Sequence, residues 1–436
     1  MNLGEVLARL GVRRVFGEPI AGSDDPGIRD ANAARLLAEA DGAVGSGLGA
    51  CFDGSVLTLT SRPGAAAERV YASSSSDVVD AVVHAHERGS GAITVELGFD
   101  PARDDADVVT APVVRDPSIA PALPAPELPT SGGPFTFDLV FAGSEVIRAG
   151  AVEALRELAD RTGLGVLNVF TAKGLFRWDS PYHLGTAGLQ LHDFALAGLA
   201  PNRPILAVGV GVDECPDPIL RDAGLSPDGA WPVTRVATER LTSVGDLVLG
   251  DLVRAAHTGP PVLGELYQRL SGVAQPLYRV EDVPLNPARA AADVGESLPE
   301  GGVVTLEPST AGWWIARTLP TTQLGSVRVP AAGRPGLAVA AALLASIEGK
   351  PAVAVVEAPI GPENRALIEL ARSRDTDLVV AVWGNDGDIA SPEDHREQLR
   401  AALAKPGVTE LPVPVSFAAA TELLTEAAGP LAAWGA

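Results

Sequence analysis

The chain has 436 residues, enough for two or three domains, and its 46% apolar and 20% charged residues indicate a folded globular protein rather than a disordered one. Its net charge of -22 argues against binding to nucleic acids or anionic membranes, because both require clustered Lys and Arg. The excess of Ala, Gly and Arg over Lys suggests a GC-rich genome, and we expect a bacterial source.

The chain contains two cysteines, Cys51 and Cys215, and no CxxC motif. This pattern predicts ordinary thiols in a reducing compartment rather than a disulfide framework or a thiolate metal site. Residues 1–17 include Glu5 and lack an apolar stretch of about 7–15 residues, so a signal peptide is not expected. Apolar runs such as residues 336–347 are too short to span a bilayer. We therefore predict a cytoplasmic protein.

Residues 1–111 form the first predicted unit, in which helices alternate with strands. Helices are expected at residues 3–10, 30–41 and 77–86, and strands at residues 12–16, 55–60 and 92–97. Such alternation is typical of a parallel sheet covered by helices. The Pro-rich residues 112–134 follow as a semi-rigid linker and mark the clearest domain boundary.

A second unit, residues 135–257, repeats the α/β pattern, residues 258–285 form a mixed connector, and residues 286–436 form a third α/β unit. In the second unit, strands are expected at residues 137–141, 165–170 and 204–210, and a helix at residues 151–161. In the third unit, a strand is expected at residues 302–306 and helices at residues 336–347, 391–403 and 416–428. The helix at 336–347 is apolar on all sides, which predicts that it is buried nearly all round.

The stretch from Ala352 to Asp388 predicts a site. Residues 353–356 and 378–383 are short apolar runs typical of buried parallel strands, and a helix is expected between them. Ligands of open α/β sheets bind at the carboxyl ends of the strands, where Glu357 and Asn385 lie. With Asp388 they form a candidate Mg²⁺ or Ca²⁺ site; the alternative is a solvated acidic rim.

Residues 166–191, VLNVFTAKGLFRWDSPYHLGTAGLQL, carry a family resemblance. The matching positions are Ala172-Lys173-Gly174-Leu175-Phe176, Asp179, Pro181, Leu184-Gly185 and Gly188. They resemble the central domain of thiamine-diphosphate (ThDP) enzymes of the acetolactate-synthase and pyruvate-decarboxylase group. Residues 10–17 and 75–97 resemble parts of that family's pyrimidine-binding domain, and residues 302–314 resemble the start of its diphosphate-binding domain.

The resemblance implies three doubly wound α/β domains with parallel sheets. These are a shortened pyrimidine-binding-like domain at 1–111, a central Rossmann-like domain at 135–257 and a diphosphate-binding-like domain at 286–436. It also implies a homodimer or homotetramer, and ThDP with Mg²⁺ as cofactors.

Two departures from the family pattern bear on the chemistry. The family places a catalytic glutamate in an Arg-His-Glu-like run before an Ala-rich helix, whereas Ala31 occupies that position here; an alternative alignment deletes the acid-bearing segment altogether. The family's metal motif is Gly-Asp-Gly at one strand tip and Asn-Asn at the next. Here the first tip reads Val356-Glu357-Ala358-Pro359, and Asn385 follows twenty-eight positions after Glu357. Gly361, Gly384 and Asn385 are the matching cofactor-binding positions.

These features leave three hypotheses. The first is a degenerate active site in a protein that acts by binding, as a partner subunit or a sensor. The second is a working ThDP- and Mg²⁺-dependent decarboxylase or carboligase on a 2-oxo acid. The third is a nucleotide- or CoA-type binding protein that uses residues 143–144 and 209–211 of the central domain. Lys173 is either an anion contact or a turn residue, and His183 and His192 either reach a pocket or simply pack.

Overall fold

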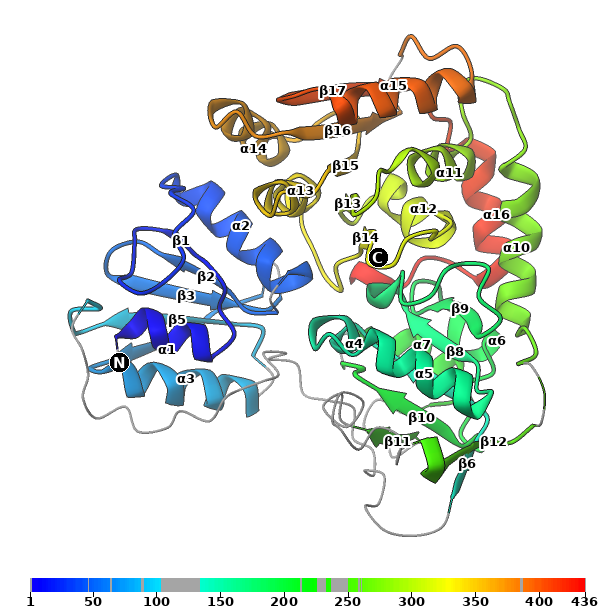
Figure 1. Cartoon of the computed structure of the whole chain (residues 1–436), viewed down its shortest axis with the longest axis horizontal. Helices are drawn as coiled ribbons and strands as arrows, with labels where there is room; N and C mark the ends of the chain where they lie inside the picture. Colours follow the sequence, from blue (N-terminus) through cyan, green and yellow to red (C-terminus); the bar gives the residue numbers. More distant parts are fainter. Residues whose placement is uncertain are drawn as a thin grey trace.

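The computed structural model describes residues 2–45, 47–62, 65–87, 90–102, 134–211, 214–225, 233–236, 250–257, 259, 261–384 and 387–435. Figure 1 shows three α/β bodies, blue, green and yellow to red, arranged around a common centre. The predicted α/β class is confirmed. The domain limits themselves remain predictions, and the predicted linker 112–134 lies outside the described residues except for Pro134.

The first sheet has the strand order β1-β2-β3-β5-β4. Its strands are β1 (Val15–Gly17), β2 (Gly49–Phe52), β3 (Val56–Thr60), β4 (Glu68–Ala72) and β5 (Ala92–Leu97). Its helices are α1 (Leu3–Arg9), α2 (Ala31–Val44) and α3 (Ser75–Glu87). The prediction of a parallel sheet is wrong here, because β3 runs antiparallel to both β2 and β5.

The antiparallel strand arises from a hairpin between β2 and β3. The Asp53 carboxylate accepts hydrogen bonds from the backbone N–H groups of Ser55 (3.0 Å) and Val56 (2.7 Å), and Gly54 has φ of +100°. An Asp-Gly pair is a standard hairpin turn because glycine adopts positive φ without strain. The turn therefore joins β2 and β3 in an antiparallel hairpin, and β2 was not among the predicted strands.

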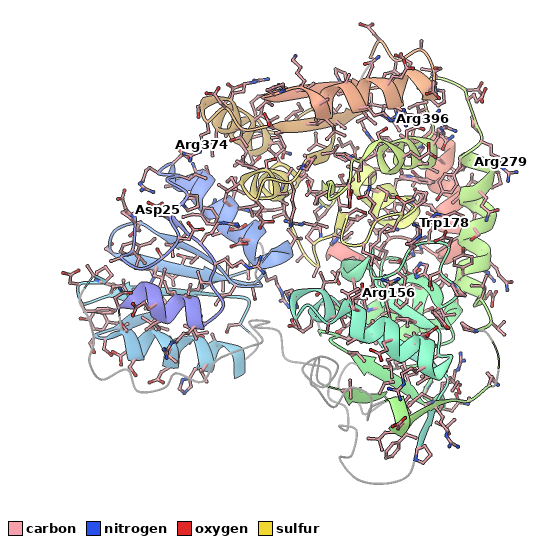
Figure 2. All side chains as sticks on the ribbon, in the orientation of Figure 1. Asp25, Arg156, Trp178, Arg279, Arg374 and Arg396 are labelled. Carbon is pink, nitrogen blue, oxygen red and sulfur yellow. The ribbon has the colours of Figure 1, made fainter. Side chains whose placement is uncertain are left out.

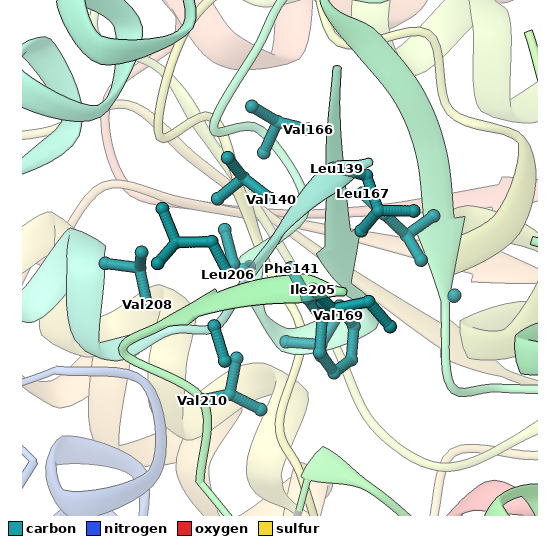
Figure 3. Close-up of a cluster of buried hydrophobic side chains, with 14 of the residues drawn as sticks. Leu139, Val140, Phe141, Val166, Leu167, Val169, Ile205, Leu206, Val208 and Val210 are labelled. Carbon is teal, nitrogen blue, oxygen red and sulfur yellow. The ribbon is translucent and has the colours of Figure 1, made fainter. Parts of the chain in front are cut away.

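The central sheet is fully parallel, with the order β11-β10-β7-β8-β9. Its strands are β7 (Leu139–Ala142), β8 (Val166–Val169), β9 (His183–Ala187), β10 (Ile205–Val208) and β11 (Val233–Val236). Flanking elements are β6 (Phe135–Phe137), β12 (Val253–Ala255), α4 (Glu145–Arg148), α5 (Val152–Thr162), α6 (Asp193–Leu196) and α7 (Asp217–Asp222). Figure 3 shows the apolar side chains of β7, β8 and β10 packed together. The order is that of a Rossmann domain. Its topological switch point, where the strand order reverses, lies between β7 and β10.

The third sheet is also fully parallel, with the order β14-β13-β15-β16-β17. Its strands are β13 (Val303–Leu306), β14 (Val327–Arg328), β15 (Ala352–Glu357), β16 (Leu378–Trp383) and β17 (Val408–Val413). Its helices are α11 (Pro287–Ser297), α12 (Thr310–Thr318), α13 (Leu337–Ile347), α14 (Pro362–Ser373), α15 (Pro392–Ala404) and α16 (Ala418–Ala428). The topological switch point of this sheet lies between β13 and β15, as in flavodoxin-like sheets. The predicted connector 258–285 contains a further helix, α10 (Glu265–Leu277).

Helix α13 joins the first and third domains. Residues Leu337–Ala345 are all buried, which confirms the prediction that this apolar helix is surrounded. One face packs on the third sheet and another on α2, so both helices belong to a single apolar core (Figure 1). Within the described part of the chain, no helix is long and apolar enough to cross a membrane.

Candidate functional site

The switch point of the third sheet brings two glutamates to adjacent strand ends. Glu307 directly follows β13, and Glu357 is the last residue of β15. The N-termini of α12 and α13 point at the same crevice, where open α/β sheets bind ligands and helix dipoles favour anions. Both helix N-termini are occupied by carboxylates of the chain itself.

Glu357 caps helix α12. Its Oε2 accepts hydrogen bonds from the backbone N–H groups of Thr310 (2.9 Å) and Ala311 (3.2 Å). The hydroxyl of Ser309 accepts the N–H of Gly312 at 3.0 Å. The first turn of a helix has no intrahelical partners for these groups, so together the two side chains satisfy the three donors that an anion would otherwise use.

Glu307 caps helix α13 in the same way. Its Oε2 accepts from the N–H of Gly336 at 2.8 Å, and its Oε1 accepts from Asn364 Nδ2 at 2.9 Å. Burial raises the pKa of Glu307, and these hydrogen bonds oppose that rise without cancelling it. Gly336 has φ of +96°, a conformation that leaves its N–H turned to the carboxylate at little steric cost.

The two strand tips predicted from residues 352–388 do lie side by side. Glu357 pairs with Trp383 across β15 and β16, and the N–H of Ala358 donates to the Trp383 carbonyl at 2.9 Å. Gly384 turns the chain after β16 with φ of +98°, and Gly361 is the N-cap of α14.

Two further metal ligands were predicted beside Glu357. Asp388 is exposed on the loop after β16, and Asn385 lies outside the described residues. Among the residues that the structure describes, no three His, Cys, Asp or Glu side chains come together so as to hold a metal ion. The metal site therefore stays a prediction.

Ala31 is the first residue of α2 and is exposed. The acids nearest to it in sequence have structural roles. Asp30 is the N-cap of α2 and accepts the N–H of Ala33 at 2.8 Å. Glu39 is 7% exposed and pairs with Arg334 at 2.7 Å, linking α2 to the loop before α13.

At the described strand ends, the helix N-termini that would bind a diphosphate are already occupied. The N–H groups that would bind the phosphates already bond to Glu357 and Glu307, and two more negative groups at the same crevice would be repelled by those carboxylates. We therefore derive no reaction step through ThDP.

The switch point of the central sheet is filled in a similar manner. Glu214, which is 4% exposed, accepts from the N–H groups of Ser144 (3.0 Å) and Gly211 (2.8 Å) and from the Thr171 hydroxyl. The turns that sequence reasoning assigned to a nucleotide thus bind a carboxylate of the chain.

Beside Glu214 lies a cavity of about 410 Å³ that all three domains line. It includes the cationic residues Arg62, Arg328 and Lys350 together with Glu348. Burial raises the pKa of Glu348, but the hydrogen bond from Lys350 and the charge of Arg328 outweigh it and lower the pKa to about 2. The cavity is thus rich in cations although the chain as a whole is strongly acidic.

Sequence reasoning undervalued three residues that line a second cavity, of about 480 Å³. They are Lys173, His183 and Arg317. The available signal was composition: the chain has three lysines, and Lys173 alone stands in an apolar context directly after a buried strand and a short helical turn.

The chain is similar to known proteins in its central domain and in its fold. Residues 138–218 match the family model of the thiamine pyrophosphate enzyme central domain. The fold is shared by a protein from Mycobacterium smegmatis, provisionally named a thiamin diphosphate-dependent enzyme, with 16% identity and a TM-score of 0.54 over 95% of this chain and 99% of that one. Benzoylformate decarboxylase from Polynucleobacter necessarius shares it too, with 14% identity and a TM-score of 0.59 over 95% and 98%.

Residues 138–218 thus match the central domain of ThDP enzymes, and the whole chain shares the fold of structures named as such enzymes. Acetolactate synthase from Mycobacterium avium is 36% identical over 76 residues, which are 17% of this chain and 12% of that protein. Acetolactate synthase from Arthrospira platensis is 26% identical over 207 residues, 44% of this chain and 33% of that protein. The chain therefore matches a third or less of the length of these curated relatives. The resemblance first seen in residues 166–191 is confirmed at the level of the family.

The cap on α12 can be tested by stability. Replacing Glu357 with alanine is expected to lower the free energy of unfolding by about 1 kcal/mol, because two backbone N–H groups lose their acceptor. Glu357→Gln keeps one acceptor oxygen and should lose about half as much. Asp388→Ala, at an exposed position, is the control and should change stability by less than about 0.5 kcal/mol. Urea unfolding measures all three, and equal stability of Glu357→Ala and the wild type would contradict the capping role.

Proposed function

We propose that this protein uses the fold of a ThDP enzyme for binding, as a partner subunit or a ligand sensor, and does not use ThDP. The observation that carries this proposal is the Glu357 carboxylate on the N-terminus of α12. A diphosphate would have to displace a carboxylate that is covalently part of the chain and already placed, so the intramolecular anion competes at a high effective concentration.

Two further observations support the loss of ThDP chemistry. Ala31 has no acidic group to hydrogen-bond an aminopyrimidine, and the nearby acids Asp30 and Glu39 are a helix cap and half of an ion pair. The two glycines of the family's Gly-Asp-Gly motif are replaced by Val356 and Ala358, and Pro359 stiffens the loop that a diphosphate would approach.

Calorimetric titration of the whole chain with ThDP and Mg²⁺ tests the proposal. We expect no saturable heat and no turnover of pyruvate. Glu357→Gly is expected to acquire weak ThDP binding, because it leaves the N–H groups of Thr310 and Ala311 without their carboxylate acceptor. Asp388→Ala is the matched control and should show no heat of ThDP binding. Micromolar ThDP binding by the wild type that Glu357→Ala abolishes would overturn the proposal, since Glu357 would then be a ligand.

The alternative is a working ThDP- and Mg²⁺-dependent enzyme that decarboxylates or ligates a 2-oxo acid. The adjacency of the strand tips at Glu357 and Trp383 favours it, as do the activities named for the relatives, acetolactate synthase and benzoylformate decarboxylase. The same titration decides between the two, because this alternative requires both heat and turnover.

Binding of a nucleotide- or CoA-type ligand is favoured by the cavity among the three domains, with its several cations. ADP and CoA belong in the same calorimetric series, with Arg328→Ala as the variant that should weaken either. The homodimer or homotetramer and the cytoplasmic location remain proposals that rest on the resemblance and on composition.

A further inference from the structure

A cavity of about 480 Å³ lies between the central and third domains, bounded by β9, α10 and α12. These elements lie close together on one flank of the molecule in Figure 1. Trp178 and Arg279, two of the residues that line the cavity, are labelled on this flank in Figure 2. A volume of this size is suited to a small organic molecule.

Two buried charges near the cavity, Arg317 and Asp193, form an ion pair with each other. Arg317 Nη2 donates to both carboxylate oxygens of Asp193, at 2.9 and 2.7 Å, and its Nη1 donates to the carbonyl of Thr186 at 2.8 Å. The side chains of Arg317 and Asp193 are 1% and 0% exposed. Because each charge neutralises the other, this pair leaves no net charge for a ligand to balance.

Lys173 is the other buried cation at this cavity. It is 6% exposed and lines the cavity, and within the described part of the chain no carboxylate pairs with it and no acceptor hydrogen-bonds to its Nζ. Burial, and then the neighbouring charge of Arg317, lower the pKa of Lys173 to about 7. A buried ammonium without a counter-ion is unfavourable, so an anion that enters the cavity would be stabilised by it and would stabilise it in turn.

His183 offers a second polar contact in the same cavity. The pairing of β8 with β9 shifts register between Val166 and Leu167, next to His183, and such bulges redirect side chains. Its Nδ1 is buried without a hydrogen-bond partner. Burial, and then the charge of Lys173, lower the pKa of His183 to about 4, so the ring that lines the cavity is neutral near pH 7 and carries one N–H donor.

The rest of the wall is largely flat and apolar. Trp178, Tyr267 and Tyr278 line it. The hydroxyl of Tyr278 donates to the Thr318 carbonyl, so this residue presents its ring to the cavity rather than a free polar group. Gly185 has φ of +123°, and a Cβ there would lie 3.9 Å from the Tyr267 ring, so the absence of a side chain keeps that part of the cavity open.

The other ionisable groups at the cavity do not neutralise Lys173. Arg279 and Glu296 are exposed, so water screens both, and Glu296 also lies 3.7 Å from Arg396. Burial raises the pKa of the Tyr278 phenol, which is therefore uncharged near pH 7.

We propose that this cavity binds a small aromatic carboxylate, with its carboxylate on Lys173 and His183 and its ring among Trp178, Tyr267 and Tyr278. The inference rests on the binding role proposed above and adds a ligand class and a site to it. The cavity lies away from the capped crevice between β13 and β15, so ThDP and a carboxylate can be titrated separately and either result can fail alone.

The test is calorimetric titration of the full chain with benzoate and indole-3-carboxylate at pH 6.0, each beside its uncharged amide. We expect at least one carboxylate to bind at least tenfold more tightly than its amide. Lys173→Met should weaken that carboxylate at least tenfold, whereas Lys350→Met, which removes a lysine outside this cavity, should leave it unchanged. Circular dichroism confirms that both variants are folded.

The pH dependence of carboxylate binding by the wild type provides an independent test. A bound carboxylate raises the pKa of Lys173, so binding takes up a proton above pH 7, and the affinity should fall about tenfold for each pH unit from 7 to 9. Equal binding of acid and amide, an unchanged affinity in Lys173→Met, or no saturable binding of either carboxylate at pH 6.0 would overturn the proposal.

Discussion

Replacing Arg317 with methionine is expected to lower the free energy of unfolding by about 3–5 kcal/mol. The substitution leaves the carboxylate of Asp193 fully buried, and the donors that remain to it among the described residues are the backbone N–H groups of Leu189 (2.8 Å) and Gln190 (3.0 Å). It also removes the ion pair that joins α12 of the third domain to α6 of the central domain. Urea unfolding followed by tryptophan fluorescence measures the loss.

Arg156→Met is the matched control. Arg156 pairs with Glu153 at 3.0 Å, but their side chains are 39% and 78% exposed, so the loss should stay below about 1 kcal/mol. The double variant Arg317→Met with Asp193→Asn should recover at least about 1 kcal/mol of the loss, because the unpaired charge is removed. Equal losses of unfolding free energy in Arg317→Met and Arg156→Met would show that the buried ion pair contributes no more to stability than the exposed one.

Lys173→Met is expected to be more stable than the wild type at acidic and neutral pH, by an amount that shrinks as the pH rises. The pKa of Lys173 is about 7 in the folded chain against an ordinary value of 10.5. Between these values the unfolded chain binds more protons, so the stability of the wild type increases with pH. Below pH 7 the full penalty applies, at most about 5 kcal/mol at 1.36 kcal/mol per pKa unit, and above about pH 10.5 it disappears.

The measurement is urea unfolding of both proteins from pH 6 to pH 10. Lys350→Met is the control, because its side chain is 45% exposed where it pairs with Glu348, so its loss should change stability by less than about 1 kcal/mol. A difference between Lys173→Met and the wild type that is the same at pH 6 and pH 10 would mean that the Lys173 amine is not buried without a counter-ion.

Much of the fold could be predicted because buried parallel strands have a strong local pattern. Runs such as residues 353–356 and 378–383 are apolar throughout, and β15 and β16 begin and end within a residue or two of them. The first sheet was mispredicted because β2 contains Gly49 and Cys51 and is only four residues long, so its pairing with β3 depends on the hairpin turn at Asp53. Short strands of mixed composition lack a local hydrophobic pattern from which they could be predicted.

The candidate site was only partly predictable. The prediction that residues 353–356 and 378–383 are parallel strands placed both carboxyl ends at one edge of a sheet, and the register of β15 with β16 confirms that these ends are adjacent. The direction of the Glu357 side chain did not follow, because its partners, Thr310 and Ala311, are more than forty positions away. The burial of Lys173 likewise depends on elements remote in sequence, α10 and α12.

Residues 352–388 and the motif at 166–191 were sufficient to predict the α/β class and the resemblance to ThDP enzymes, since apolar periodicity and motif spacing are properties of neighbouring residues. The assembled fold was needed to show that Glu307 and Glu357 cap the helices of the ligand crevice and that Lys173 has no carboxylate beside it in the described chain. Hydrogen bonding and desolvation depend on which groups meet in space, and residues distant in the chain supply those groups.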